Sequence, residues 1–163
     1  MAIKHVSVFT DGACLGNPGP GGYGVVLLYE GHRKELSGGF RLTTNNRMEI
    51  LAAVVALEAL KEKCRVTLHS DSQYVVNAIE KGWAERWRSN QWRRNKRDTA
   101  LNPDLWERLL DGVARHQAEF RWVKGHAGHP ENERCDQLAM AAASGEHLAI
   151  DTVYERSVPQ ERS

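Results

Sequence analysis

The 163 residues carry a formal net charge of +1, with 41% hydrophobic and 26% charged residues, which is typical of one ordinary globular domain. No apolar run approaches the roughly 18 residues of a membrane span, and the chain enters its first predicted strand without a leader, so we expect a cytoplasmic protein that has no membrane partner. Its three cysteines, Cys14, Cys64 and Cys135, are odd in number and far apart, which argues against a disulfide framework.

The first half of the chain predicts strands and one long helix. Three segments have the β-branched or alternating pattern of strands: residues 5–10, 23–29 and 33–40. Gly12 and the Gly- and Pro-rich run behind it predict a turn directly after Asp11. Asn46 and Glu49 have the spacing of a capping box, and the apolar run that follows predicts a central helix as far as Leu60. Residues 65–71 repeat the opening pattern, a short strand that ends in an aspartate.

The second half predicts shorter elements. These are helices at 74–81 and 84–88, an exposed loop at 90–102, a helix at 104–116 and a strand at 120–124. Pro130 favours the start of a last helix after a flexible Gly-rich link. The order of elements predicts an α/β fold, an α+β mixed sheet of five strands with three antiparallel strands first, parallel strands after them and helices on its faces. We expect one domain over residues 1–143 and a flexible tail over 144–163.

Four acidic residues lie at the ends of apolar elements, namely Asp11, Glu49, Asp71 and Asp136. If the strands that end in Asp11 and Asp71 are parallel neighbours about 5 Å apart, their carboxylates meet at one edge of the sheet. No basic residue stands beside either aspartate in the sequence, and buried acids need compensation, so all-oxygen ligation of Mg²⁺ or Mn²⁺ is one interpretation. The other is four separate acids that serve in turns, at helix starts or in solvent.

Several short motifs together closely resemble the bacterial type 1 ribonuclease H family. They are Thr10-Asp11-Gly12-Ala13-Cys14 with Asn17-Pro18-Gly19, Thr44-Asn45-Asn46-Arg47-Met48-Glu49, Ser70-Asp71-Ser72-Gln73-Tyr74, and Val123-Lys124-Gly125-His126 through Asn132-Glu133-Arg134-Cys135-Asp136. The resemblance runs from about Lys4 to Ala143, in the family's order, and it implies the ribonuclease H-like fold.

The resemblance also implies an activity. It is that of an endonuclease which cuts the RNA strand of an RNA–DNA hybrid and leaves 3′-hydroxyl and 5′-phosphate ends. Asp11, Glu49, Asp71 and Asp136 would hold two Mg²⁺ ions, with Mn²⁺ as a substitute. Two ions roughly 4 Å apart can activate water and stabilise the leaving oxygen, so no protein nucleophile is required. His126 would serve as a mobile proton shuttle or help product release.

Recognition of a hybrid requires small polar groups that sense 2′-hydroxyls in a wide, shallow minor groove. By the resemblance, Cys14, Asn17, Asn45, Asn46 and Gln73 contact sugars, and Glu49 also reaches a 2′-hydroxyl. Asn17 and Thr44 would help to seat a DNA phosphate. The same asparagines and Thr44 are also common in turns and helix caps, and the two roles are compatible.

The segment from Trp83 to Asp98 is the most basic part of the chain, with six Arg or Lys residues against Glu85 and Asp98. It resembles the basic protrusion with which the family grips the DNA backbone. The substrate contacts implied there are Trp83, Trp87, Arg88, Trp92, Arg93, Arg94 and Lys96. Tryptophans at helical spacing more often pack against their own domain, so both interpretations stay open.

Three alternatives remain at this stage. One is another two-metal nuclease that acts on DNA, and one is a non-catalytic module that binds RNA–DNA hybrids without using the acids. The third is a zinc site at His126, His129 and Cys135, whose short spacing lacks a fourth ligand. Nothing in the sequence requires more than a monomer.

Overall fold

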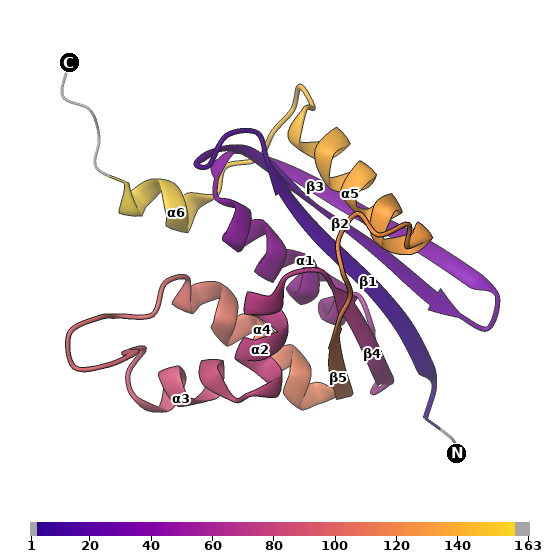
Figure 1. The fold of residues 1–163 in the computed structure, drawn as a ribbon, viewed down its shortest axis with the longest axis horizontal. Coiled ribbons are helices and arrows are strands. Elements are labelled where there is room, and N and C mark those ends of the chain that lie inside the picture. The colour runs from indigo at the N-terminus through magenta and orange to yellow at the C-terminus, as the bar shows by residue number, and fades with distance from the viewer. Residues whose placement is uncertain (1–2, 159–163) are drawn as a thin grey trace.

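The computed structural model describes residues 3–158 and contains a five-stranded sheet in the order β3-β2-β1-β4-β5 (Figure 1). The strands are β1 His5–Cys14, β2 Gly19–Tyr29, β3 His32–Thr43, β4 Arg65–Ser70 and β5 Gln117–Trp122. The first three strands pair antiparallel, and β4 is parallel to both β1 and β5. The predicted mixed sheet is therefore confirmed.

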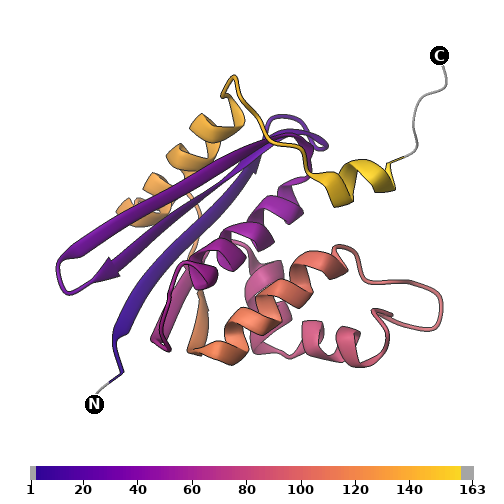
Figure 2. The same ribbon diagram turned by 180° about the vertical axis from the view of Figure 1, so that it is seen from behind.

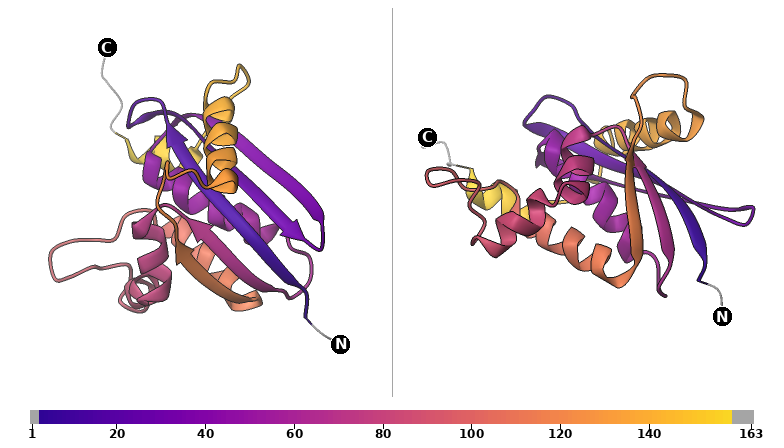
Figure 3. Two further views of the ribbon diagram at one scale, coloured as in Figure 1. Left: turned by 45° about the vertical axis from the view of Figure 1, so that its right-hand side comes forward. Right: turned by 60° about the horizontal axis from the view of Figure 1, so that its bottom comes forward.

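Six helices complete the part of the chain that the structure describes. They are α1 Asn45–Glu58, α2 Gln73–Glu80, α3 Trp83–Ser89, α4 Pro103–Arg115, α5 Pro130–Ala143 and α6 Thr152–Ser157. Figure 3 shows α5 alone against one face of the sheet, and Figure 2 shows α1 crossing the other face with α4 beside it. No helix among residues 3–158 is both long and apolar enough to cross a membrane.

Helix α1 is the centre of the main core, as its apolar run predicts. Ten of its residues, from Arg47 to Leu57, are buried. Met48, Ile50 and Leu57 are fully buried, as is Trp106 of α4. A helix that buries nearly its whole circumference needs a layer on each side, and here those layers are the sheet and α4. The position of Glu49 is thereby fixed by packing on both sides.

The glycines of β1 and β2 differ from the prediction. The sequence predicts a turn after Asp11, whereas β1 continues through Gly12 to its end at Cys14. A Cβ atom at Gly12 would lie 2.4 Å from the backbone nitrogen of Glu49, and one at Gly24 would lie 2.2 Å from the carbonyl oxygen of Cys135. These glycines allow α1 and α5 to pack directly on the sheet. They are close-approach positions inside strands.

Two element boundaries also differ. The N-cap of α1 is Thr44, one of the capping residues that the sequence offers at 43–46, and its hydroxyl accepts a hydrogen bond from the Arg47 backbone N–H at 3.2 Å. The predicted capping box of Asn46 with Glu49 is therefore wrong. Strand β5 begins at Gln117 and ends at Trp122, whereas the sequence predicts residues 120–124. The strand lies at the edge of the sheet and exposes most of its residues, so its start has no hydrophobic signal.

The segment after α5 differs from the flexible tail that the sequence predicts for 144–163. Ala149 pairs with the backbone of β3, donating to Gly39 at 3.0 Å and accepting from Arg41 at 2.9 Å. Asp151 is buried and accepts hydrogen bonds from Thr43 and Arg47, both at 2.7 Å. These partners lie more than 100 residues earlier, so local sequence does not reveal them. Residues 159–163 of the predicted tail lie outside the described residues.

Candidate metal centre and nucleic-acid face

Asp11 and Asp71 come together because β1 and β4 are parallel neighbours. The paired register runs from His5↔Arg65 to Thr10↔Ser70, which confirms the predicted neighbouring strands. Strand β4 ends at Ser70, whereas β1 continues beside β2. Asp11 therefore lies in β1 directly after the last residue that pairs with β4, and Asp71 directly follows the last residue of β4.

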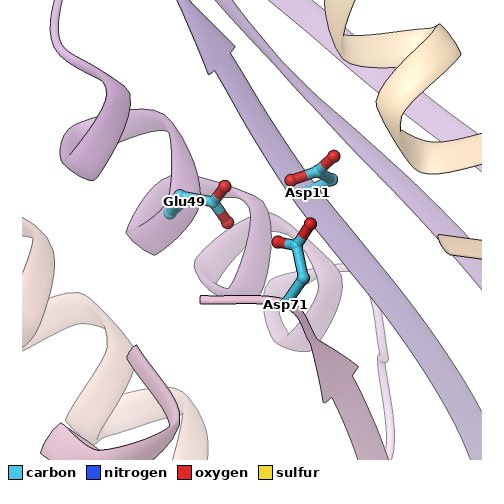
Figure 4. Close-up of side chains that lie close together, drawn as sticks. All are labelled: Asp11, Glu49 and Asp71. Carbon is cyan, nitrogen blue, oxygen red and sulfur yellow. The ribbon is translucent and has the colours of Figure 1, made fainter. Parts of the chain in front are cut away.

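Glu49 reaches the same place from the first turns of α1. Figure 4 shows its carboxylate directed toward Asp11 and Asp71. One ligand atom from each of the three residues can be chosen so that all lie within 4.8 Å of one another. We call Asp11, Glu49 and Asp71 the acid cluster. Within residues 3–158 no other group of three or more His, Cys, Asp or Glu side chains meets this distance criterion. The zinc site considered at His126, His129 and Cys135 is therefore not formed.

Burial gives the acid cluster unusual electrostatics. Asp11 and Glu49 are 4% and 6% exposed. Burial raises the pKa of Asp11 from its ordinary 3.8 to about 8, and the charges of Asp71 and Asp136 raise it further, although the hydrogen bond with Glu49 opposes this shift. Burial also raises the pKa of Glu49 well above its usual range, as does the charge of Asp11. Without a bound cation the pair therefore retains a proton near neutral pH.

The donor atoms of the acid cluster fit a hard divalent cation. The Gly12 backbone N–H donates to Asp11 Oδ1 at 2.9 Å, but Glu49 Oε2 is buried and has no hydrogen-bond partner among the described residues. A buried carboxylate oxygen without a partner is unfavourable unless something else satisfies it. Because every donor is a carboxylate oxygen, the chemistry suits Mg²⁺ or Mn²⁺.

Asp136 lies outside the acid cluster but close to it. It is the seventh residue of α5, which packs on the sheet face opposite α1, and it is half-buried. Its negative charge contributes to the raised pKa of Asp11. The structure thus places this fourth predicted carboxylate near the cluster without bringing it within the 4.8 Å group.

The loop that carries His126 begins against the acid cluster. A Cβ atom at Gly125 would lie 2.8 Å from Asp71 Oδ2, so the backbone passes next to this carboxylate. His126 is exposed and has a positive φ of 55°, and Gly128 has a φ of 77°. His129 is the N-cap of α5 and buries its Nδ1 atom. His126 is therefore placed on an exposed, tightly turned loop beside Asp71.

The residues predicted to contact sugars and a DNA phosphate lie around the start of α1, except Gln73, which lies at the start of α2. The Asn45 backbone N–H donates to Asn17 Oδ1 at 3.1 Å, which joins the β1–β2 loop to the helix. Cys14 directs its thiol toward the carbonyl oxygens of Gly19 and Thr43, at 3.4 and 3.5 Å. A groove of about 600 Å³ lies alongside and is lined by, among others, Asn17, Thr44, Asn46, Trp92 and Tyr154. Gln73 is exposed at the first position of α2.

In the basic segment from Trp83 to Asp98, the tryptophans pack against the core, whereas the basic side chains of the loop are exposed. Trp87 packs against Tyr74 and Trp106, with ring centroids 6.3 and 5.9 Å apart, and Trp83 and Trp92 are partly buried on the core. Arg88 lies 3.6 Å from Asp111. The exposed basic residues that remain on the loop between α3 and α4 are Arg93, Arg94, Lys96 and Arg97, beside the exposed Asp98. That loop projects from the body of the protein (Figure 1).

Two residues without a predicted role have structural partners next to these sites. Arg47 is 4% exposed and forms two-pronged ion pairs with Asp104 and Asp151. We call these three residues the Arg47 cluster. Trp122, at the end of β5, donates its indole N–H to the carbonyl oxygen of Asp71 at 3.1 Å. The only sequence signals were a charged residue inside an apolar helix and a tryptophan next to the loop of His126.

Comparison with known proteins identifies the family. The RNase H family profile matches residues 3–144. A Ribonuclease H of Desulforamulus reducens is 70% identical over 149 residues, which cover 91% of this chain and 94% of that protein. A Ribonuclease H of Syntrophus aciditrophicus is 68% identical over 151 residues, which cover 93% of this chain and 87% of that protein.

Solved structures agree. LC9-RNase H1, described as a type 1 RNase H with the type 2 active-site motif, superposes with a TM-score of 0.80 at 34% identity over 96% of this chain and 81% of that chain. LC11-RNase H1 in complex with an RNA/DNA hybrid has a TM-score of 0.66 at 24% identity over 85% of this chain and 96% of that chain, which supports the fold alone. On these matches, and with acidic residues gathered at the end of β4, the chain belongs to the bacterial type 1 ribonuclease H family of enzymes.

Proposed function

We propose that the protein hydrolyses the RNA strand of RNA–DNA hybrids by two-metal-ion catalysis and leaves 3′-hydroxyl and 5′-phosphate ends. Asp11, Glu49, Asp71 and Asp136 would hold two Mg²⁺ ions, for which Mn²⁺ can substitute. The observation that carries the proposal is the acid cluster, in which carboxylates from β1, α1 and the end of β4 converge without a basic residue among them. Family membership supports cleavage of hybrids as the activity.

The side chains divide the work by position. Divalent cations bound at the carboxylates would supply a Lewis acid and a more acidic water. Asp11 and Glu49 would release the proton that they retain once a cation is bound, since their burial favours the protonated form only while no positive charge is present. His126, exposed beside Asp71, takes up or delivers a proton during turnover. The protein needs no nucleophile of its own.

Selection of a hybrid is assigned to the polar groups around the starts of α1 and α2. Cys14, Asn17, Asn45, Asn46 and Gln73 present small donors and acceptors of the kind that recognise sugar hydroxyls in a shallow groove. The contacts of Asn17 with Asn45 hold two of these groups in fixed relation. Thr44 and Asn17 border the 600 Å³ groove, where they would seat a DNA phosphate.

The exposed loop between α3 and α4 extends this face. Arg93, Arg94 and Lys96 would attract the DNA backbone through charge, together with Arg88 and the tryptophans of the segment. A non-catalytic hybrid-binding module would need the basic loop but not the acid cluster. A DNA nuclease of similar fold would need the acids but not the sugar-sensing groups. Both sets occur in this chain. We also propose that the enzyme acts as a monomer in the cytoplasm.

The test is cleavage of an end-labelled RNA–DNA hybrid in Mg²⁺, beside duplex DNA, duplex RNA and single-stranded RNA. The native protein is compared with Asp71→Asn, which keeps the size of the side chain and removes its charge. We expect only the RNA strand of the hybrid to be cut, into products with 5′-phosphates. The variant should bind the hybrid and not cut it.

Each result separates the candidates. Binding without cleavage by the native protein, in Mg²⁺ and in Mn²⁺, would favour the hybrid-binding module. Cleavage of duplex DNA would favour the DNA nuclease. Full activity of Asp71→Asn would remove the acid cluster from the mechanism, whatever the substrate.

A further inference from the structure

Trp122 is an exposed tryptophan with a specific contact. Trp122 is the last residue of β5, pairs with Ser70 at the end of β4, and is 46% exposed. Its indole N–H nevertheless donates to the main-chain carbonyl oxygen of Asp71 at 3.1 Å. An indole has one donor and no acceptor, so this is the single hydrogen bond that the side chain can make. The single hydrogen bond of this side chain is therefore made to the backbone of an acid-cluster residue.

Asp71 is the single residue between the end of β4 and the N-cap of α2. Strand β4 ends at Ser70, and Ser72 is already the N-cap of α2. The Ser72 backbone N–H donates to Ser70 Oγ at 3.1 Å, and the Val123 N–H donates to the Ser70 carbonyl at 2.9 Å. Both neighbours of Asp71 are therefore fixed, and the peptide that follows Asp71 is held through its carbonyl by Trp122.

The chain that carries Trp122 contacts Asp71 a second time. Three residues later, Gly125 passes so close that a Cβ atom there would lie 2.8 Å from Asp71 Oδ2. Trp122 thus holds the main-chain side of Asp71, while Gly125 borders its carboxylate. His126 follows Gly125 directly, so the anchor at Trp122 precedes the loop that carries the exposed histidine.

We propose that Trp122 is a positioning residue, which sets the direction of the Asp71 carboxylate through the hydrogen bond from its indole N–H to the Asp71 carbonyl. The inference rests on the proposed metal-dependent cleavage. Trp122 acts on the chemical step through Asp71 and does not itself bind the hybrid. A stacking platform for a base is the competing role, because the residue is exposed and bases stack on aromatic rings.

Two substitutions separate the hydrogen bond from the aromatic surface. Trp122→Phe keeps an aromatic ring and removes the donor. Trp122→His keeps an N–H at the ring position equivalent to the indole nitrogen and removes the fused benzene ring. Glu119→Gln, at an exposed position of the same strand, is the control for changes to β5. Because the side chain is exposed, we expect all three variants to fold, which thermal unfolding checks.

The measurements are kcat and KM on an RNA–DNA hybrid, and Mg²⁺ binding to the hybrid-free protein by titration calorimetry. We expect Trp122→Phe to lower kcat about three- to tenfold, as the loss of one hydrogen bond would, and to weaken Mg²⁺ binding by a similar factor. Its KM should stay within about twofold. Trp122→His should restore most of kcat and of Mg²⁺ binding, and Glu119→Gln should match the native protein.

A rise in KM shared by Trp122→Phe and Trp122→His, with kcat and Mg²⁺ binding unchanged, would assign the stacking role and overturn the proposal. Native behaviour of Trp122→Phe in both measurements would overturn it as well. The native protein is measured alongside in every series. If it neither cuts the hybrid nor binds Mg²⁺, the proposed function has failed, and this outcome is distinct from a failure of the role of Trp122.

Discussion

Helix α1 supplies one residue to each of two buried charge clusters, and the two clusters are built in opposite ways. The acid cluster gathers Asp11, Glu49 and Asp71 with no basic side chain among them. In the Arg47 cluster, Arg47 binds Asp151 through Nε and Nη2 at 2.7 and 3.0 Å. It binds Asp104 through Nη1 and Nη2 at 3.0 and 2.8 Å. Among residues 3–158, the Arg47 cluster has its charges paired by ion pairs, and the acid cluster has no such pairing.

The pKa values move in opposite directions. Burial raises the pKa of Asp11 and Glu49, so these groups resist ionisation. Burial also opposes the charged forms of Arg47 and Asp104, but their mutual hydrogen bonds outweigh it, raising the pKa of Arg47 and lowering that of Asp104. Full pairing is what a structural role requires, whereas a buried acid group without a basic partner either keeps a proton or takes a cation from outside. The Arg47 cluster therefore has the properties of a site that stabilises the fold, and the acid cluster has those of the metal site that we propose.

The largest expected effect is on the unpaired cluster. Asp11→Asn should reduce hybrid cleavage in Mg²⁺ by about a thousandfold or more, because several kcal/mol of charge stabilisation at a metal corresponds to such a factor. The same substitution should stabilise the metal-free protein at pH 8 by roughly 1 to 3 kcal/mol, since it removes one of the buried acids that repel each other. Single-turnover cleavage and urea unfolding in EDTA measure the two effects.

The dependence of stability on pH provides the control for Asp11→Asn. The pKa of Asp11 in the folded protein, about 8, lies above its ordinary 3.8, so its contribution to stability is complete at low pH and is lost as the pH rises toward 8. In EDTA the free energy of unfolding of the native protein should fall between pH 5 and pH 8, and less steeply for Asp11→Asn. Saturating Mg²⁺ should restore the free energy of unfolding of the native protein at pH 8 and should not change that of Asp11→Asn. A variant that is less stable than the native protein at pH 8 would contradict the comparison.

The second largest effect is expected in the paired cluster. Arg47→Met should lower the free energy of unfolding by about 3 to 5 kcal/mol, because it leaves the buried carboxylate of Asp151 without its positively charged partner. Arg41→Gln is the matched control. Arg41 also makes a two-pronged pair, with Glu155 at 2.9 and 2.8 Å, but at an exposed position, and its loss should be below about 1 kcal/mol. Equal losses in urea unfolding would mean that burial does not distinguish these ion pairs.

The acid cluster could be anticipated from sequence, and the Arg47 cluster could not. Asp11 and Asp71 each follow a short β-rich run, and the parallel pairing of β1 with β4 brings the two positions together, although β1 itself continues to Cys14. Glu49 stands at the start of an apolar helix, which must cross the sheet to be buried. Arg47 has the same local context, but its partners lie 57 and 104 residues away. Hydrophobic periodicity and helix or strand propensity are local properties of the sequence, so they give no information on partners that far away.

The fold shows the same limit. The succession of strands and helices along the chain follows from hydrophobic patterns, so a mixed sheet was predictable. Gly12 and Gly24 look like turn residues, yet they lie inside strands because helices press on them, and only the packed structure contains that information. The indole contact of Trp122 with Asp71 likewise depends on the register of β5 against β4. Its residue type gave no indication of it.

A smaller effect is expected from His126, which is charged only on protonation and lies outside both clusters. His126→Ala should slow turnover about ten- to a hundredfold without abolishing it, because proton transfer by one side chain contributes about that much and bound metal ions already make the water more acidic. His147→Ala, at another exposed histidine, should leave kcat unchanged. If His126→Ala were as inactive as Asp71→Asn, the histidine would belong with the essential groups.

The smallest effect on kcat and on stability is expected where the charges are exposed. Replacing Arg93, Arg94 and Lys96 together by Gln should raise KM several-fold and reduce the slope of log KM against log salt by up to about three, one for each lost phosphate contact. These side chains project from a turn held by Asn95, whose Oδ1 accepts from the backbone N–H groups of Arg97 and Asp98, both at 2.8 Å. Unfolding should therefore be unaffected.

The matched control for the basic loop removes the same number of positive charges elsewhere. Lys34, Lys61 and Lys63 are exposed at the opposite end of the sheet from the acid cluster, and their replacement by Gln should leave both KM and its salt slope near the native values. Equal changes in the two triple variants would mean that net charge alone attracts the hybrid. A change confined to the loop variant would place the DNA strand there, because screened charges act only within about 10 Å at ordinary salt.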